Sequence, residues 1–310
     1  KGHQVWANDL QYYSYALNRH YIGNHLDLYF QWLIEDIPEL LVSKVGETKN
    51  IVLAYLQNMK GKKWFIYKNY SLWGTEDHEH QRQYFSDENA MKCDAIRSKI
   101  EEWNKSGKIT EDEYFFLLAS LLEAIDKVAN TASVYGAFLK KLKKSAEKQL
   151  ELKPAKYHLN DHSHTVTNED VGLLVKNTKH DVVYLDPPYN HRQYSGNYHI
   201  LETIARYDSP EIHGKTGMRD CREQKSDYCS RANVKKAYTE LVDSIDAKYI
   251  FLSYNDEGLM SLDDIREIMS RRGKYGVFQR EYQRFKADKT EARNHKKDSV
   301  IEYLHYVQIQ

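Results

Sequence analysis

Short apolar strands alternate with helices in the second half of the sequence, and this alternation constrains the fold more than any other feature. Residues 181–185 and 248–253 are the clearest strands. Ser261, with Asp264 three residues later, has the pattern of a helix cap. Strands that alternate with helices are typical of a parallel sheet covered by helices. We therefore predict an α/β fold for residues 155–310.

Two more strands are predicted near the C-terminus, at residues 277–285 and 299–308. A polar loop joins them without a crossover helix, so we expect an antiparallel hairpin that adds to the sheet. Near the N-terminus, the apolar run 5–7 is followed by Asp9 and then by a helix-like stretch over about residues 10–24. An acidic residue at the end of a strand is common where α/β folds bind a ribose.

Residues 44–154 have a different texture, with helices and irregular segments in which aromatic residues are interleaved with lysines. Thr110 and Glu113 have the spacing of a capping box. The apolar residues that follow recur at helical spacing, which indicates a core-facing helix. We predict three parts: 1–43 and 155–310 form an α/β core, and 44–154 is a mainly helical insert.

The composition excludes several classes of protein. Lys+Arg 45 balance Asp+Glu 45, and 41% of the residues are hydrophobic, as in globular chains. No apolar run reaches the roughly 18 residues of a membrane span, and no apolar signal-peptide stretch is present. The three cysteines are too few for a disulfide framework, which favours a reducing, cytoplasmic setting. The histidines and cysteines lack the close paired spacing of a zinc site, so we predict no metal.

The motif Asp186-Pro187-Pro188-Tyr189 directly follows the strand at 181–185. Consecutive prolines hold the backbone extended and remove two N–H donors. The result is a rigid corner that presents a carboxylate, bare carbonyl oxygens and an aromatic ring at the ligand-binding end of a strand. Such a corner suits a planar group with an exocyclic amine, whose protons the oxygens accept while the ring stacks on its face.

This motif, within the longer string at residues 186–205, resembles the Dam-like class of S-adenosylmethionine-dependent N6-adenine DNA methyltransferases, particularly the members of restriction–modification systems. The resemblance extends to residues 252–255 and 300–304. It implies a Rossmann-like class I methyltransferase sheet with an antiparallel C-terminal hairpin, interrupted by a target-recognition region at 44–154. It also implies S-adenosyl-L-methionine as cofactor, double-stranded DNA as substrate, a bacterial cytoplasmic location and a cognate restriction endonuclease as functional partner.

The resemblance assigns roles to the motif residues. Asp186 and the carbonyl of Pro187 would accept hydrogen bonds from the adenine amine, and Asp186 would also lie against the cofactor. Pro188 would keep the corner rigid, and Tyr189 would stack on the base. The amine nitrogen would then attack the methyl group directly, while the preorganised acceptors stabilise its developing positive charge. Because the target atom lies inside the duplex, the adenine must be flipped out of the stack.

Two further residues match cofactor contacts of the family. Asp9 corresponds to the acidic residue that holds the ribose hydroxyls. Asp161 falls where the family contacts the cofactor's adenine. The glycine-rich loop of the family, Phe-x-Gly-x-Gly, is expected before the strand that ends at Asp9, and the printed sequence does not contain it.

Basic residues near these motifs are candidates for contacts with DNA phosphates. They are Lys62 and Lys63 in the insert, and Arg192, Lys296 and Lys297 in the catalytic part. We expect sequence readout to come from the insert. The glycine-containing stretches 195–196 and 214–217 are expected to be mobile loops near the catalytic corner, rather than phosphate cradles, and to order when DNA binds.

Two alternatives remain open at this point. The acceptor geometry is equally suited to an adenine in RNA, so an RNA adenine methyltransferase fits the motif. A non-catalytic DNA-binding or specificity subunit of the same fold fits the absence of the glycine-rich loop. Cytosine C5 chemistry is excluded because no cysteine follows a proline. An aspartate at position 186, rather than asparagine or serine, disfavours glutamine and cytosine-N4 methylation.

Overall fold

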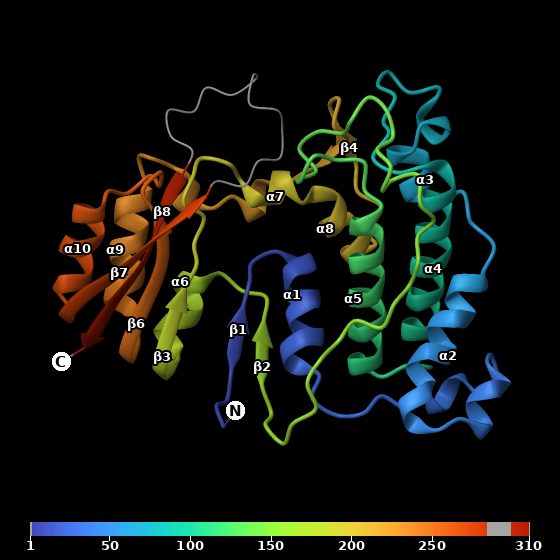
Figure 1. The fold of residues 1–310 in the computed structure, drawn as a ribbon, viewed down its shortest axis with the longest axis horizontal. Helices are drawn as coiled ribbons and strands as arrows, with labels where there is room; N and C mark the ends of the chain where they lie inside the picture. The colour runs from blue at the N-terminus through green and yellow to red at the C-terminus, as the bar shows by residue number, and fades with distance from the viewer. Residues whose placement is uncertain (1, 284–298, 310) are drawn as a thin grey trace. The chain divides into compact units, whose positions relative to one another are not determined.

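The computed structural model describes residues 2–283 and 299–309 (Figure 1). The chain divides into two compact units. The first consists of residues 1–168 and 198–221, and the second of residues 169–197 and 222–310. Lys296 and Lys297, predicted to contact DNA, lie outside the described residues. No helix in the described ranges combines the length and the apolar character that a membrane crossing requires.

The first unit is mainly helical and includes a two-stranded parallel sheet and a short antiparallel hairpin. Its elements are β1 (Trp6–Asn8), α1 (Tyr12–Asn18), α2 (Val45–Asn58), α3 (Phe65–Tyr70), α4 (Asp87–Lys105), α5 (Glu111–Lys127), β2 (Thr165–Thr167), α8 (His199–Arg206), β4 (Ile212–His213) and β5 (Met218–Arg219). In the parallel pair, Ala7 lies opposite Val166. The carboxyl ends of β1 and β2 therefore lie at the same edge of their sheet.

Helix α5 forms the centre of the first unit. The predicted capping box is present, because the Thr110 hydroxyl accepts from the N–H of Glu113 and the Glu113 carboxylate accepts from the N–H of Thr110. Most of α5 is buried, and its apolar side chains share one core with residues between Ala16 and Leu152 and with α8. Segments 1–43 and 44–154, which the sequence analysis separated, therefore pack around a common core.

The second unit is an α/β structure. Its elements are α6 (Val171–Leu174), β3 (Lys179–Leu185), α7 (Tyr194–Asn197), α9 (Val234–Ser244), β6 (Asp246–Asn255), α10 (Leu262–Ser270), β7 (Gly273–Gln283) and β8 (Ser299–Ile309). The sheet has the order β3-β6-β8-β7. β3 and β6 are parallel, and β8 is antiparallel to both β6 and β7. The predicted strands and the antiparallel C-terminal hairpin are confirmed, with β8 inside the sheet rather than at its edge.

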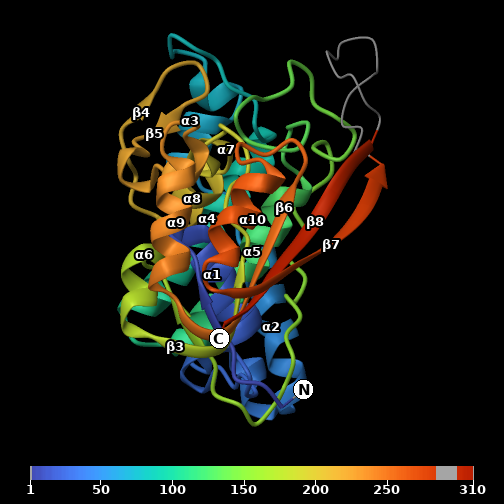
Figure 2. The same ribbon diagram turned by 90° about the vertical axis from the view of Figure 1, so that its left-hand side faces the viewer.

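One face of this sheet is covered by helices. Ile250, Leu252 and Val307 point to that face and pack with the apolar residues of α9 and α10, which Figure 2 shows beside the strands. Side chains at the alternate positions point to the other face. There Tyr184 is 59% exposed and Phe278 is 62% exposed. The structure is thus mixed α/β with a mixed sheet, and the carboxyl ends of β3 and β6 lie at one edge.

Candidate active site

The Asp-Pro-Pro-Tyr motif begins where β3 ends. Leu185, the last residue of β3, pairs with Leu252 of β6 and is buried in the core of the second unit. Asp186 follows at the carboxyl end of the strand and is exposed. Protein atoms around its carboxyl desolvate it in part and raise its pKa above the ordinary range. Within the described ranges, no hydrogen bond occupies this carboxyl group, so it is available to a ligand.

The loop after β6 holds the corner in place. The carbonyl oxygen of Tyr189 accepts a hydrogen bond of 2.9 Å from the N–H of Leu259. The hydroxyl of Tyr254 lies 3.5 Å from the same oxygen and accepts a bond of 3.2 Å from the N–H of Met260. The rings of Tyr189 and Tyr254 meet edge to face, with centroids 6.4 Å apart. These contacts orient the aromatic ring of the motif.

Glu302 adds a second carboxyl group near the corner, a feature that the sequence analysis quoted in a motif but gave no role. It lies on β8 opposite Asn255, whose side chain hydrogen-bonds to it. Burial raises the pKa of Glu302, and the negative charge of Asp186 raises it further. Burial, followed by the charges of Glu302 and Asp186, also raises the pKa of Tyr189, which therefore stays neutral. The corner is thus acidic.

A hollow of about 390 Å³ opens beside Tyr254, lined by residues of the loop after β6, by Tyr303 and His305 of β8, and by Arg231. His305 is fully buried, and its Nδ1 lies 2.8 Å from the hydroxyl of Tyr275. Burial lowers the pKa of His305 to about 4, so the ring is neutral at pH 7. The hollow adjoins the corner through Tyr254, but none of the predicted site residues lines it.

Asp9, in the first unit, lies at the carboxyl end of β1. One carboxylate oxygen accepts from the N–H of Gln11 at 2.8 Å, and the other accepts from the hydroxyl of Ser14 at 2.6 Å. Burial raises the pKa of Asp9. Each oxygen has a further lone pair that these bonds do not use. Asp9 therefore both fixes the start of α1 and keeps the capacity to accept from a ligand's hydroxyl groups.

Glu202 of α8 stabilises the same helix terminus, which the sequence analysis did not anticipate. Its two carboxylate oxygens accept from the N–H groups of Tyr12 and Tyr13 at 3.2 and 2.8 Å. It also pairs with Arg206 at 2.5 Å. Free N–H groups at a helix start need acceptors, and a buried acidic residue in α8 supplies them. The sequence offered only a weak signal, an acidic residue that follows the apolar pair Ile200 and Leu201.

The structure does not bring Asp161 to the edge where Asp9 lies. Asp161 is exposed and precedes β2, at the amino end of that strand. Because β1 and β2 are parallel, the residue that reaches the edge of Asp9 is Asn168, after β2. The side-chain amide of Asn168 donates a bond of 2.7 Å to the backbone carbonyl of Asp9. Asp9 lies at the carboxyl end of its strand, as its predicted contact with the ribose requires, whereas Asp161 does not lie at that end of β2.

Lys62 and Lys63 are exposed and lie just before α3. The ammonium group of Lys62 lies 5.2 Å from the ring centroid of Trp64, and that of Lys63 lies 5.2 Å from the ring centroid of Tyr67. Asp94 fixes this segment by accepting from the N–H groups of Trp64, Ile66 and Tyr67. The segment therefore presents two cations and the exposed ring of Trp64 on a fixed backbone, while Tyr67 is buried.

Arg192 lies five residues after Pro187, the first residue of the Pro-Pro pair, and is exposed in the second unit. Its backbone is held by a bond from its N–H to the Asn190 side chain at 2.9 Å. Nothing in residues 2–283 and 299–309 forms a group of three or more histidines, cysteines, aspartates or glutamates that could hold a metal. The candidate site residues in the described ranges are therefore carboxylates, basic side chains and aromatic rings.

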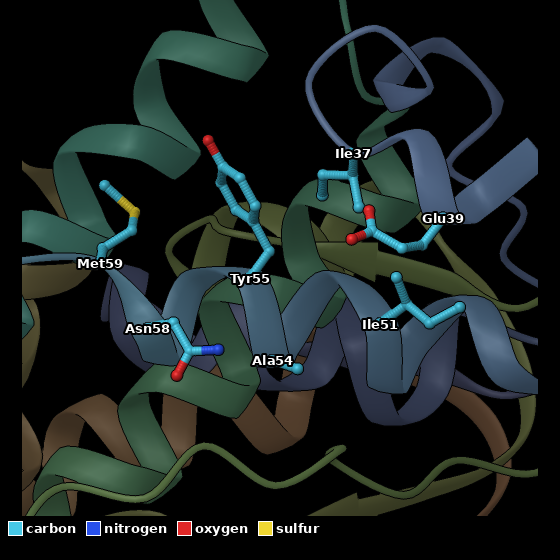
Figure 3. A pocket seen from close by; sticks show the side chains of 7 residues that line it. All are labelled: Ile37, Glu39, Ile51, Ala54, Tyr55, Asn58 and Met59. Atoms are coloured by element: carbon cyan, nitrogen blue, oxygen red, sulfur yellow. The ribbon is translucent and has the colours of Figure 1, made fainter.

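A second hollow, of about 430 Å³, lies in the first unit between α2 and the turn before it (Figure 3). Ile37, Ile51, Tyr55 and Glu39 line it. Its only ionisable carboxyl group is that of Glu39, and no predicted site residue belongs to it. It therefore offers no set of groups that the predicted chemistry requires.

The corner at the end of β3 defines the class of protein. Asp-Pro-Pro-Tyr at the carboxyl end of a strand in a mixed sheet is the arrangement expected of an amino-group methyltransferase. The chain belongs to the D12 class N6 adenine-specific DNA methyltransferase family, whose pattern matches residues 1–268. The predicted family and its enzymatic activity, N6 methylation of adenine in DNA, are thereby confirmed.

Curated relatives include type II methyltransferases. The chain is 50% identical over 305 residues to type II methyltransferase M.NlaIII of Neisseria lactamica, covering 98% of the chain and 84% of that protein. It is 36% identical to type II methyltransferase M.CviAII of Paramecium bursaria Chlorella virus 1, covering 100% and 85%. It is also 36% identical to type II methyltransferase M.FokI of Planomicrobium okeanokoites, covering 99% of the chain and 46% of that protein. No solved structure matches the chain.

Gly258 provides a test of the contacts that hold the corner. A Cβ atom at this position would lie 2.1 Å from Cε1 of Tyr254, so Gly258→Ala must displace the ring or the loop that carries Leu259. We expect kcat for DNA methylation to fall by about 10- to 100-fold, because a misplacement near 1 Å has effects of this size. Gly46→Ala is the matched control, since a Cβ there meets no atom within 4 Å. Equal turnover by both variants would contradict the prediction.

Proposed function

We propose that this protein is the modification enzyme of a restriction–modification system, and that it moves a methyl group from S-adenosyl-L-methionine to N6 of a flipped adenine in duplex DNA. The observation that carries the proposal is the free carboxylate of Asp186 at the end of β3 in a member of this family. The names of the relatives, type II methyltransferases, support the restriction–modification setting. A cognate endonuclease is then a functional partner that cuts the same unmethylated site.

Asp9 fits the cofactor that the family implies. Its two carboxylate oxygens already accept one bond each from Gln11 and Ser14, which fixes their orientation, and each retains a lone pair for a ribose hydroxyl. Asn168 adds a side-chain amide at the same edge. When bound, S-adenosyl-L-methionine supplies an electrophilic methyl group. Asp161, which precedes β2, stays a prediction for the contact with the cofactor's adenine, supported by the resemblance alone.

Asp186, Pro187 and Tyr189 act on the target base. The carboxylate of Asp186 and the carbonyl of Pro187 accept hydrogen bonds from the two amine protons, which draws the nitrogen lone pair out of conjugation with the ring. The raised pKa of Asp186 makes it a better acceptor for the proton that the nitrogen must lose. Pro188 keeps the turn rigid, and Tyr189 stacks on the flipped adenine.

The exposed cations carry the proposal for DNA binding. Lys62 presents charge beside the exposed ring of Trp64 in the first unit, and Lys63 lies over the buried ring of Tyr67. Arg192 presents a guanidinium next to the motif in the second unit. We assign these groups, with Lys296 and Lys297 as predicted from sequence, to backbone phosphates. DNA rather than RNA is the substrate that the family defines. The same family membership favours an enzyme over a non-catalytic specificity subunit.

The proposal is tested by transfer of labelled methyl from S-adenosyl-L-methionine, with the full-length protein and duplex DNA of mixed sequence. We expect all label in N6-methyladenine after nucleoside analysis, confined to one short sequence context. Matched RNA of the same sequence is the control substrate. Label in RNA alone would contradict duplex DNA as the substrate. Label in N4-methylcytosine would contradict the role of Asp186 as the acceptor for an adenine amine. Absence of label in either polymer, together with absence of cofactor binding, would favour the specificity subunit.

A further inference from the structure

The hairpin β4–β5 in the first unit has an unusually well anchored tip. Its strands have two residues each, and the turn between them is 214–217, with Gly214 and Gly217 in the left-handed region at φ 64° and 65°. The buried hydroxyl of Tyr70 in α3 donates a bond of 2.9 Å to the carbonyl of Gly217. Figures 1 and 2 both show the hairpin beside α3. The stretch that the sequence analysis expected to be a mobile loop is therefore tied to the helical core.

A buried arginine lies beneath this turn. Arg82 is 6% exposed and donates to the carbonyl oxygens of Gly214 at 2.9 Å and Lys215 at 3.2 Å. A third, longer bond of 3.4 Å runs to the carbonyl of Asn69 in α3. Across the described part of the chain, no carboxylate pairs with the Arg82 guanidinium, which is held by carbonyl dipoles alone.

Burying a cation without a counter-charge is costly, because desolvation is not offset by an opposite charge. Burial accordingly lowers the pKa of Arg82. Apolar side chains packed between α3 and the hairpin would hold the turn without the desolvation cost of a buried cation. The unpaired charge therefore indicates a function at the surface above it, where it produces a positive field that an anion would compensate.

The turn itself offers donors to such an anion. Its carbonyl groups face Arg82 and Tyr70, and the N–H of Gly217 bonds to the carbonyl of Gly214 at 3.1 Å. The N–H groups of Lys215 and Thr216 have no acceptor anywhere in the described ranges. Successive free N–H groups in a tight turn form an anion-binding concavity, and the exposed Lys215 side chain adds a cation.

We propose that the turn Gly214–Gly217 binds a phosphate group of the DNA backbone. The inference rests on the DNA substrate of the family, and DNA is the phosphate-bearing polymer that this protein must hold. The turn is continuous with the segment already assigned to DNA, because Asn69 and Tyr70 belong to the α3 helix that follows Lys62 and Lys63. His213 lies 3.9 Å from Glu211 and carries a charge only when protonated, so Lys215 is the side chain that supplies a fixed charge at the turn.

The test is Lys215→Gln in the full-length protein, with duplex DNA affinity measured over a series of KCl concentrations. We expect affinity at moderate salt to fall by roughly fivefold, and the slope of log affinity against log salt to become shallower by about 0.9, as for one lost phosphate contact. The loss should be the same for any DNA sequence, because phosphate contacts do not read bases. Lys127→Gln, an exposed lysine paired with Glu123 at 3.5 Å, is the charge-matched control.

Neutral methylphosphonate groups placed one at a time in the duplex locate the contact. One position should weaken binding of the unmodified protein and have no further effect on Lys215→Gln. An unchanged salt slope for Lys215→Gln, or equal losses for both proteins at every methylphosphonate, would overturn the proposal. Methyl transfer by the unmodified protein separates this result from the proposed function. If the unmodified protein methylates adenine while Lys215→Gln leaves the salt slope unchanged, only the phosphate site fails, whereas absence of any transfer by the unmodified protein contradicts the proposed function itself.

Discussion

Asp186→Ala is expected to abolish methyl transfer while DNA affinity stays within a few-fold of the unmodified protein. The substitution removes the acceptor that holds the amine and takes its proton, and loss of one preorganised polar group in a transition state costs about 10²- to 10³-fold in kcat. Since Asp186 serves both roles, we expect a loss at or above the upper end of that range. Labelled methyl transfer at saturating DNA and cofactor measures it, with DNA binding measured in parallel.

The pH dependence of the unmodified enzyme gives a second test of the role of Asp186. Burial raises the pKa of Asp186, so the protonated, non-accepting form persists to a higher pH than for a solvated aspartate. Activity should fall as pH falls through this raised pKa and level off above it.

Asp181→Asn on the same strand is the matched control for Asp186→Ala, because Asp181 is exposed and pairs with Lys248 at 2.6 Å. Near-normal turnover by Asp186→Ala would remove Asp186 from the mechanism.

The elements of the second unit were predictable because local signals agree with the tertiary structure. The apolar runs at 181–185 and 248–253 lie within β3 and β6, and Ser261 with Asp264 forms the predicted capping box of α10. The Pro-Pro pair ends β3 by its own chemistry, whatever surrounds it. Each of these features depends on a few adjacent residues, which is the range over which sequence patterns are informative.

The arrangement of the first unit was not predictable in the same way. Helix α8 follows the catalytic motif in sequence, yet packs in the core with α5 and caps α1 through Glu202. Tyr12 and Glu202 are 190 positions apart in the sequence. No local sequence pattern marks a contact over such a separation. The assignment of Asp161 rested on the family resemblance in a polar stretch that is hard to align. The strand that follows, β2, begins only at Thr165, so Asp161 lies before its amino end.

Buried charges were the other feature that composition concealed. In a sequence with equal numbers of acidic and basic residues, nothing distinguishes Arg82 and Arg97 from surface arginines. In the structure they are only 6% and 1% exposed. Both donate to main-chain carbonyls of residues more than 100 positions away, 132 for Arg82 to Gly214 and 107 for Arg97 to Ile204. A planar guanidinium with five donors can join two distant segments of backbone at once. The same long-range use of arginine leads to the second prediction of large effect.

Arg97→Met is expected to destabilise the first unit by about 3 to 5 kcal/mol, the cost of removing one member of a buried, hydrogen-bonded charge network. Arg97 of α4 donates to the carbonyls of Ile204 and Ala205 at the end of α8, at 2.9 and 3.1 Å. It also donates to the hydroxyl of Tyr114 at 2.9 Å and pairs with Glu101 at 2.9 Å. Methionine fills similar volume but leaves these acceptors buried without donors.

Urea unfolding followed by tryptophan fluorescence isolates this effect, because all 5 tryptophans (Trp6, Trp32, Trp64, Trp73 and Trp103) belong to the first unit. The unfolding midpoint of Arg97→Met should fall accordingly at an unchanged denaturant slope. Lys105→Met on the same helix is the control, since its side chain is 74% exposed and its pairing with Glu101 contributes at most about 1 kcal/mol. If Arg97→Met unfolds within that margin of the unmodified protein, the guanidinium does not join α4 to α8, and the docking of α8 depends on its apolar face alone.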